Sequence, residues 1–136
     1  MEKLPKVYEC MDQVVPTLSP DTPILKAVSF LLRHRVTGAP VVDYKGKLLG
    51  IITESDLLRL ISEGVGSKPP KEAKVADFMT SEVVTVPSTT DVYFVAGVFN
   101  RNRFRRLPVV DDGRVVGAIT RYDLLRVIQE HAPKYW

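Results

Sequence analysis

Apolar and polar residues follow two different periods along the chain. In the longer segments apolar residues recur every three or four positions, which predicts helices with one buried face. The predicted buried positions are Ile24, Val28, Leu31 and Leu32 in one helix and Val92, Val95, Ala96 and Phe99 in another. Asp21-Thr22-Pro23 predicts the start of the first of these helices, because a capping oxygen is followed by a proline.

The shorter apolar runs predict β-strands. Residues 14–18 and 83–86 are brief β-branched candidates, and Pro16 restricts the first to a sheet edge or the end of a ladder. Residues 39–43 and 47–52, and again 107–111 and 114–119, are apolar runs separated by a turn. Asp112-Gly113 favours a hairpin, since both residues tolerate positive φ. Each half of the chain therefore predicts an antiparallel hairpin.

The whole pattern occurs twice. Residues 50–59 return as residues 117–126, with Gly, Thr, Asp and the final Leu-Leu-Arg at the same places. Each half has the order β-α-β-β-α, and its closing helix starts at Thr53 or Thr120. We expect the first closing helix to end near Gly64 and the second to end before Pro133. The sequence predicts an α/β protein of the α+β type, with repeats at 6–63 and 74–131 and a linker at 64–73.

The junction between the last strand and the last helix is the candidate binding element of each repeat. A strand that leads directly into a helix leaves free backbone N–H groups and the positive end of a helix dipole. Such a junction suits an anionic or hydroxyl-rich ligand. The same Thr-x-x-Asp spacing is also close to a helix capping box, and both interpretations stay open at this point.

Composition narrows the class of protein. Hydrophobic residues make up 45% and charged residues 26% of the 136 residues, which is typical of a soluble globular protein. No apolar run approaches the roughly 18 residues of a membrane span, and residues 1–6 lack the features of an export signal. We therefore expect a cytoplasmic location. The net charge of +3 fits an anionic ligand but is low for a nucleic-acid binder.

Catalytic and metal-binding chemistry find no support in the sequence. Cys10 is the single cysteine, and we expect a buried thiol with no disulfide. His34 and His131 lie far apart, with no cysteine or carboxylate at ligand spacing. Since no nucleophile lies beside a recognisable base, we expect neither an enzyme nor a required cofactor.

Three groups of residues together resemble the CBS domain: residues 75–80, residues 35–43 and the two Gly-x-x-Thr-x-x-Asp motifs. The likeness runs from about Lys6 to Glu130, so the chain resembles a stand-alone tandem CBS pair, or Bateman module. The resemblance implies two repeats packed through their sheets about a pseudo-two-fold axis. It also implies two clefts for AMP, ADP or ATP, with S-adenosylmethionine or NAD as alternatives.

The resemblance also implies which residues bind the ligand. Asp56 and Asp123 would accept hydrogen bonds from ribose hydroxyls, with one carboxylate oxygen for each hydroxyl of the diol. Thr53 and Thr120 would meet phosphate or ribose, and Tyr122 completes the candidate set. The cleft of Asp123 would also use Thr17, Val36, Thr37 and Gly38, and the cleft of Asp56 would use Val84, Thr85, Phe104, Arg105 and Arg106. The two arginines replace Thr37-Gly38 in the repeat and suit phosphate recognition.

We therefore predict an energy-sensing regulatory module that binds an adenine nucleotide. Its regulated partner would be a separate, unidentified protein, and pairing through helices would give a homodimer. Two alternatives remain: nucleic-acid binding through residues 101–106, with Phe104 stacking on a base, and a ligand-free structural dimer.

Overall fold

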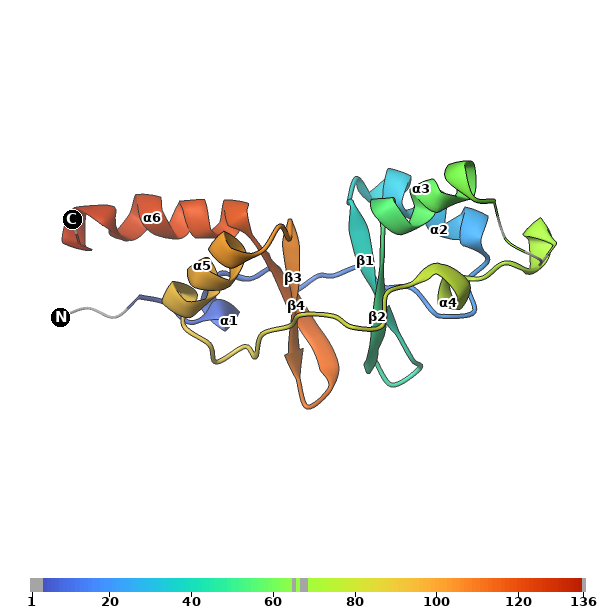
Figure 1. The fold of residues 1–136 in the computed structure, drawn as a ribbon. Helices are drawn as coiled ribbons and strands as arrows, with labels where there is room; N and C mark the ends of the chain where they lie inside the picture. Colours follow the sequence, from blue (N-terminus) through green and yellow to red (C-terminus); the bar gives the residue numbers. More distant parts are fainter. Residues whose placement is uncertain (1–3, 65, 67–68, 136) are drawn as a thin grey trace. The chain divides into compact units, whose positions relative to one another are not determined.

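The computed structural model describes residues 4–64, 66 and 69–135 (Figure 1). Strands β1 (Gly38–Val42) and β2 (Leu48–Thr53) form one antiparallel hairpin, and β3 (Arg106–Asp111) and β4 (Arg114–Thr120) form another. The helices are α1 (Val7–Cys10), α2 (Ile24–His34), α3 (Glu54–Ser62), α4 (Val75–Phe78), α5 (Val92–Arg101) and α6 (Arg121–Tyr135), with a 3₁₀ turn at Pro70–Glu72. Residues 65, 67 and 68 of the predicted linker lie outside the described residues.

The chain folds into two compact units, and these units do not coincide with the two sequence repeats. The β1–β2 unit contains Pro16–Val83, and the β3–β4 unit combines Met1–Val15 with Val84–Trp136. Helix α1, which opens the first repeat, contacts β4 and α6 of the second (Figure 1). Helix α4, which opens the second repeat, contributes to the core of the first. Each repeat therefore supplies its first residues, up to Val15 in the first repeat and 74–83 in the second, to the other unit. We call these residues the lead-in segments.

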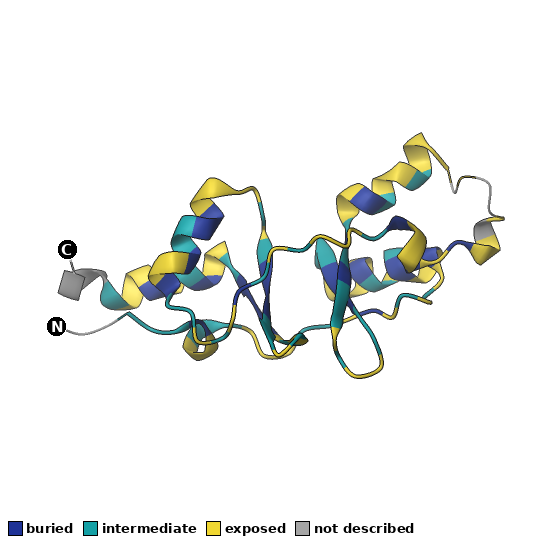
Figure 2. Cartoon of the chain, turned by 60° about the horizontal axis from the view of Figure 1, so that its bottom comes forward, coloured by how far each residue is buried: buried dark blue, intermediate teal, exposed yellow. Residues whose placement is uncertain are grey.

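Each unit has its own hydrophobic core, and the buried residues occupy one side of each helix (Figure 2). In the β1–β2 unit the core includes Ile24, Ala27, Leu31, Val41, Ile52, Val75 and Phe78. In the β3–β4 unit it includes Val7, Val86, Val95, Phe99, Leu107, Val109 and Ile119. Both cores thus combine helix, hairpin and lead-in residues, and burial of these apolar side chains stabilises each unit.

The glycine that opens each repeated motif, Gly50 or Gly117, lies against the backbone of a lead-in segment. The backbone of Asp12 exchanges two hydrogen bonds with Ala118, at 2.9 and 3.0 Å. A Cβ atom added at Gly117 would lie 2.8 Å from the carbonyl oxygen of Asp12, and one at Gly50 would lie 2.7 Å from that of Thr80. Only glycine lets the lead-in backbone approach the strand this closely without displacing it.

Several local predictions are confirmed. Both hairpins are antiparallel, and the turn at Asp112-Gly113 has positive φ angles of 50° and 79°. The closing helices begin directly after Thr53 and Thr120. Helix α3 ends at Ser62, close to the predicted Gly64. These features depend on local residue types, which explains why the pattern predicted them.

The strand predicted at the start of each repeat is not formed. Residues 14–18 and 83–86, all of them described, form no strand; only Leu18 and Val86 make isolated parallel bridges, to Val41 and Val109. A ladder through Leu18 would need N–H groups two residues away, and Pro16 and Pro20 have none. Beyond Val86, the N–H of Ser88 donates to the carboxylate of Asp111 at 3.0 Å instead of to a strand.

Helix α2 departs from its prediction in two ways. Leu32, predicted to be buried, is 74% exposed, and Ala27 is buried in its place. Ile24, Ala27 and Leu31 form the buried row, and Leu32 lies about 100° further round the helix. No described side chain caps α2, whose N-cap residue is Pro23. The Ile24 N–H donates instead to the Ala73 carbonyl at 3.0 Å.

Helices α5 and α6 also differ from the prediction. Val98 is buried in α5 where Ala96 was predicted, and Ala96 is only half-buried. Asp91 caps α5 by accepting a hydrogen bond of 2.9 Å from the Phe94 N–H. Helix α6 continues to Tyr135, so the predicted end before Pro133 is wrong. A proline near a helix end removes one backbone donor and does not always end the helix.

Candidate functional site

In the β1–β2 unit the strand–helix junction is closed by a reciprocal capping box. Asp56 Oδ2 accepts hydrogen bonds from the Thr53 N–H at 2.8 Å and from Thr53 Oγ1 at 2.9 Å. Thr53 Oγ1 accepts in turn from the Asp56 N–H at 3.4 Å. Asp56 Oδ1 accepts from Thr80 Oγ1 at 3.3 Å, so a residue of the lead-in segment supports the carboxylate. The capping interpretation of the motif is therefore realised in the structure.

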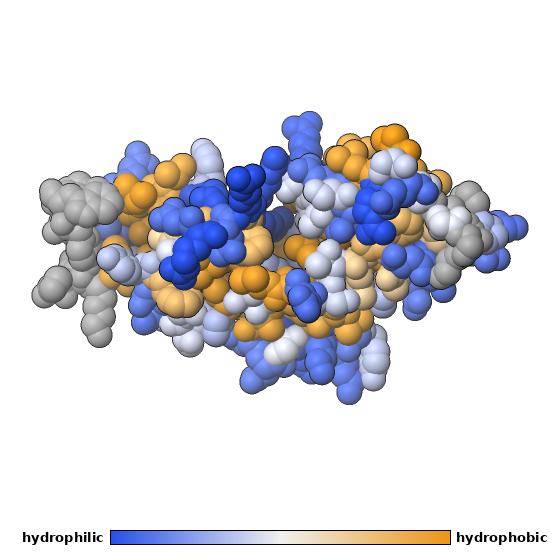
Figure 3. Space-filling view, in the orientation of Figure 1, coloured by the Kyte–Doolittle hydropathy of each residue, from blue (hydrophilic) through white to orange (hydrophobic). Residues whose placement is uncertain are grey.

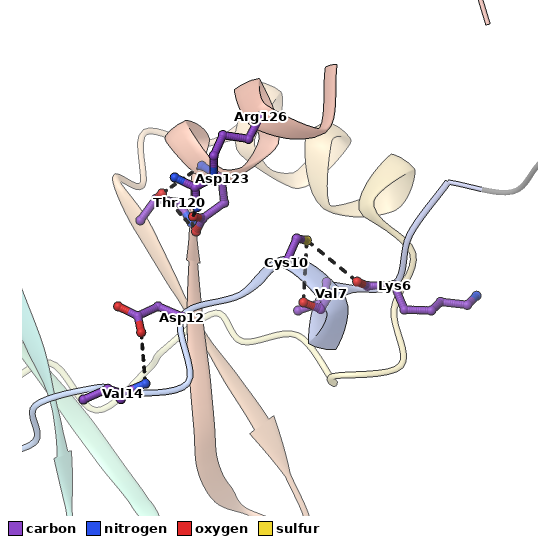
Figure 4. Close-up of polar contacts among 8 residues, drawn as sticks. All are labelled: Lys6, Val7, Cys10, Asp12, Val14, Thr120, Asp123 and Arg126. Atoms are coloured by element: carbon purple, nitrogen blue, oxygen red, sulfur yellow. Dashed lines mark hydrogen bonds and ion pairs between the residues drawn. The ribbon is translucent and has the colours of Figure 1, made fainter. Parts of the chain in front are cut away.

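The β3–β4 unit repeats this arrangement with a different supporting residue (Figure 4). Asp123 Oδ2 accepts from the Thr120 N–H at 2.8 Å and from Thr120 Oγ1 at 3.1 Å. Asp123 Oδ1 forms an ion pair with Arg126, three residues further along α6. A cation thus supports Asp123 where a neutral hydroxyl supports Asp56. The two junctions have the same threonine–aspartate hydrogen bonds but a different charge beside the carboxylate.

Capping leaves part of each carboxylate available to a ligand. Each carboxylate oxygen has two lone pairs. The two hydrogen bonds from threonine occupy Oδ2, whereas Oδ1 has a single partner among the described residues, Thr80 at Asp56 and Arg126 at Asp123. One further donor can therefore bind Oδ1 at full strength. A second ribose hydroxyl would have to share Oδ2 or displace the threonine hydroxyl. The expected contact, with one carboxylate oxygen for each ribose hydroxyl, would therefore compete with the capping hydrogen bonds at Oδ2.

Register pairing brings further predicted residues to each junction. Gly38 pairs with Thr53, and the carbonyl of Thr37 accepts a hydrogen bond of 2.8 Å from the Glu54 N–H. In the other unit Arg106 pairs with Thr120. Since residues directly opposite in an antiparallel pair project on the same side, Arg106 lies beside the Asp123 junction, whereas the resemblance assigned it to the cleft of Asp56. The equivalent position in the β1–β2 unit has no side chain.

The remaining predicted residues lie elsewhere in the same two units. Val36 is half-buried against the core, and Thr17 is exposed beside the bridge between Leu18 and β1. Val84 is exposed and Thr85 half-buried next to the corresponding bridge of Val86. The predicted sharing of each ligand site between the two repeats stays a prediction.

Four predicted residues of the β3–β4 unit differ in exposure. Phe104 packs against the core, which leaves less of its ring available for stacking on a base. Arg105 is exposed, and Arg106 is half-buried with its Nε buried and without a hydrogen-bond partner among the described residues. Tyr122 is exposed, and the guanidinium of Arg126 lies 5.7 Å from its ring centroid.

Cys10 and Asp12 lie near the Asp123 junction, although the sequence assigned neither of them to it (Figure 4). Burial raises the pKa of the Cys10 thiol to about 11, and the negative charge of Asp123 adds to this shift. The Cys10 thiol donates weakly to the carbonyls of Val7 and Lys6, at 3.6 and 3.7 Å. Cys10 is half-buried where a buried thiol was expected, and a thiol with a raised pKa is a poor nucleophile at neutral pH.

Within residues 4–64, 66 and 69–135, no group of three or more histidine, cysteine or acidic side chains could hold a metal ion. Over the same described stretches, no helix combines the length and the apolar composition of a bilayer span.

Comparison with known proteins identifies the family. The CBS domain family model matches the chain twice, over residues 7–63 and 75–130. The chain belongs to the CBS domain family. The resemblance seen in the sequence is thereby confirmed, and the mixed α/β fold with two small antiparallel sheets is that of a CBS domain pair.

The CBS pair is similar to part of an enzyme. Inosine-5′-monophosphate dehydrogenase of Aquifex aeolicus is 34% identical to it over 128 residues. These residues cover 93% of this chain but only 25% of the dehydrogenase. Most of that enzyme has no counterpart in the CBS pair, so the similarity carries no inference about dehydrogenase chemistry.

Two solved structures of CBS pairs are similar over nearly their whole length. CBSX2 in complex with AMP has a TM-score of 0.82 and 30% identity, covering 93% of this chain and 98% of CBSX2. The CBS pair of protein MJ0100, in complex with 5′-methylthioadenosine and S-adenosyl-L-methionine, has a TM-score of 0.78 and 28% identity. It covers 93% of this chain and 98% of that one.

Proposed function

We propose that this CBS pair is a regulatory module that binds an adenosine-containing ligand, preferably AMP, ADP or ATP, and changes its contacts with a separate protein. The observation that carries this proposal is the pair of buried aspartates at the strand–helix junctions. Asp56 is 9% and Asp123 is 6% exposed, and each keeps acceptor capacity on Oδ1. The AMP complex of CBSX2 and the adenosine-derivative complex of MJ0100 support the same ligand class.

The residues divide by the part of the ligand that they would meet. Oδ1 of Asp56 or Asp123 would accept a hydrogen bond from a ribose hydroxyl. The backbone N–H groups at the starts of α3 and α6 offer partial positive charge to a phosphate. Residues proposed to contact the base or the phosphates are Thr17, Val36, Thr37, Gly38, Thr53, Val84, Thr85, Phe104, Arg105, Arg106, Thr120 and Tyr122.

A ligand panel tests the proposal directly. The melting temperature of the protein would be measured with AMP, ADP, ATP, S-adenosylmethionine, NAD and GTP in excess. A ligand that binds only the folded state raises the melting temperature by mass action. An increase with adenosine ligands and none with GTP is the expected result. No shift with any adenosine ligand, together with flat calorimetric titrations, would refute ligand sensing.

Asp123→Ala should weaken binding of the preferred adenosine phosphate about tenfold, because loss of a hydrogen bond to a charged group costs roughly 1.5–3 kcal/mol. Asp56→Ala should weaken the other site instead. Isothermal titration calorimetry of both variants measures the change, and it resolves one affected site in each.

Helix capping has to be separated from this effect, because both aspartates close capping boxes. Asp91→Ala is a matched control: Asp91 caps α5 in the β3–β4 unit but belongs to neither junction. We expect Asp91→Ala to lower the melting temperature of the unliganded protein without changing the dissociation constant. If Asp91→Ala and Asp123→Ala weakened binding equally, the ribose contact would be disproved.

The proposed assembly is a homodimer formed through helices. Hydrophobic surface lies over α3 (Figure 3), where Leu58 and Ile61 are exposed, and α2 adds exposed Leu25 and Leu32. A second copy of the chain is the proposed occupant, because a closed two-fold dimer covers the same patch on both subunits. Light scattering should give twice the chain mass of 15.2 kDa at tens of micromolar protein. A monomer mass with and without AMP would contradict the dimer.

A further inference from the structure

Helices α2 and α5 occupy equivalent places in the two units but end differently. At the end of α2, Arg35 takes the left-handed conformation with φ of 54°. The Val36 N–H then donates to the Leu31 carbonyl at 3.1 Å, so the backbone itself satisfies the last turn. At the end of α5, Asn102 is extended, and its N–H reaches the Phe99 carbonyl only at 3.4 Å. The Asn102 side chain donates to the Val98 carbonyl at 2.8 Å, which leaves the carbonyls of Phe99 and Asn102 for other donors.

Arg121 supplies these donors from the first residue of α6. Its Nη2 donates to the carbonyls of Phe99 and Asn102, at 2.6 and 2.9 Å. Its Nε donates to the carbonyl of Phe104 at 3.3 Å, and its guanidinium lies 5.2 Å from the ring centroid of Phe99. One planar guanidinium thus joins three carbonyls of residues 99–104, which a flexible ammonium group could not do in the same geometry.

The position of this arginine indicates that it serves α5. A cation in the first turn of α6 is unfavourable to that helix, because the dipole is positive there. The carbonyls at the end of α5 carry the negative end of a dipole, so the same charge is favourable to α5. The equivalent residue in the β1–β2 unit is Glu54, where α2 closes with its own backbone.

The segment that Arg121 holds leads directly into the proposed phosphate-binding arginines. The carbonyl of Phe104 belongs to the peptide bond that joins Phe104 to Arg105, and Arg106 follows as the first residue of β3. Arg121 also follows Thr120, the threonine of the Asp123 junction. It therefore links the arginine segment to this junction within one unit.

We propose that Arg121 is a positioning residue that holds Arg105 and Arg106 in the orientation that meets the phosphates of the ligand. This inference rests on the proposed binding of an adenosine phosphate. Loss of Arg121 would let the segment 102–106 change its backbone direction, and the phosphate contacts would weaken while the ribose and base contacts remained.

The test compares AMP with adenosine by calorimetry on four proteins: wild type, Arg121→Gln, Arg121→Lys and Arg114→Gln. Arg121→Gln should weaken AMP binding about fivefold to tenfold and change adenosine binding less than twofold, because charge-assisted bonds need correct geometry. Arg121→Lys keeps the charge but not the planar fork, and we expect most of the same loss. Arg114, exposed at the start of β4, is the charge-matched control and should change neither affinity.

A second comparison separates positioning from direct contact. In a protein that already carries Arg105→Thr and Arg106→Gly, Arg121→Gln should cause no further loss of AMP affinity, since coupled residues are not additive. A full additional loss would show that Arg121 meets phosphate itself and would overturn the inference. Equal losses for AMP and adenosine would also overturn it, because they would assign Arg121 to general stability of the unit.

The same measurements distinguish failure of the proposed ligand binding from failure of the positioning role of Arg121. If the wild-type protein binds neither AMP nor adenosine, the proposed function fails and the inference fails with it. If the wild type binds AMP and the Arg105→Thr/Arg106→Gly variant loses that affinity while Arg121→Gln retains it, only the positioning role fails. The melting temperature of each variant shows that the compared proteins are folded.

Discussion

Replacing Val7 with aspartate should unfold the β3–β4 unit, although Val7 belongs to the first repeat in sequence. The Val7 side chain is 0% exposed and lies in the core of that unit, and its N–H donates to the Thr90 carbonyl at 2.8 Å. A carboxylate there would be buried without a partner, at a cost of several kcal/mol, against a total stability of roughly 5–15 kcal/mol for a typical domain. Circular dichroism during urea unfolding measures the loss.

The lead-in segment provides its own control. Val14 lies seven residues further along and is 80% exposed, so Val14→Asp should change stability by less than about 0.5 kcal/mol. Val75, also 0% exposed, holds the same place in the β1–β2 unit, and Val75→Asp should unfold that unit instead. An unaltered unfolding curve for Val7→Asp would show that α1 does not complete the core.

This exchange of lead-in segments could not be predicted from the sequence. Val7 and Val75 occupy equivalent positions in the two repeats, and both cores are built from the same residue types. Periodicity identifies a buried valine but not the hairpin that buries it. The hairpins were predictable for the opposite reason, because the residues that specify them are neighbours along the chain.

The first strands show how a pattern can predict the wrong element. Residues 14–18 and 83–86 are rich in β-branched residues, which favour a pleated strand. A ladder also needs N–H groups on alternate residues, and these were missing at Pro16 and Pro20 or were taken up by Asp111 at Ser88. The residue types favoured a strand, but too few backbone N–H groups were available to form a ladder.

The candidate site was predictable as far as its chemistry is local. Thr53 with Asp56, and Thr120 with Asp123, lie three residues apart, and the structure places both pairs in capping boxes. The groups that support the carboxylates could not be found in the same way. Thr80 reaches Asp56 across 24 positions of sequence, and no spacing rule indicates such a contact.

The difference between the two junctions also follows from tertiary contacts. Thr80 and Asp12 are equivalent residues of the two lead-in segments, but one offers a hydroxyl and the other a carboxylate. Arg126 could have been suspected from its i,i+3 spacing to Asp123. The equivalent Arg59 nevertheless pairs with Glu63 at 3.0 Å, so spacing alone does not determine the partner.

Replacing Arg105 and Arg106 with Thr and Gly, the residues of the other repeat, should lower AMP affinity at least tenfold and leave adenosine affinity nearly unchanged. Charge-assisted hydrogen bonds to phosphate are stronger than neutral ones and are lost only where the ligand carries charge. ATP should lose more than AMP, because it offers more phosphate oxygens to the two guanidiniums. The register pairing of Arg106 with Thr120 supports this role, since it directs one of the two arginines toward a strand–helix junction.

The matched control removes the same two charges from neighbouring exposed positions, as Arg101→Gln with Arg103→Gln. Exposed charges act weakly and are screened by salt, so this variant should change AMP affinity less than twofold at physiological ionic strength. Calorimetric titration of adenosine, AMP and ATP at low and physiological salt separates local contact from general electrostatics. If the two double variants lost equal affinity for AMP, or if adenosine weakened as much as AMP, Arg105 and Arg106 would have no specific role in phosphate recognition. A steep loss of affinity for single-stranded nucleic acid in both variants, with AMP unaffected, would instead favour a nucleic-acid surface at residues 101–106.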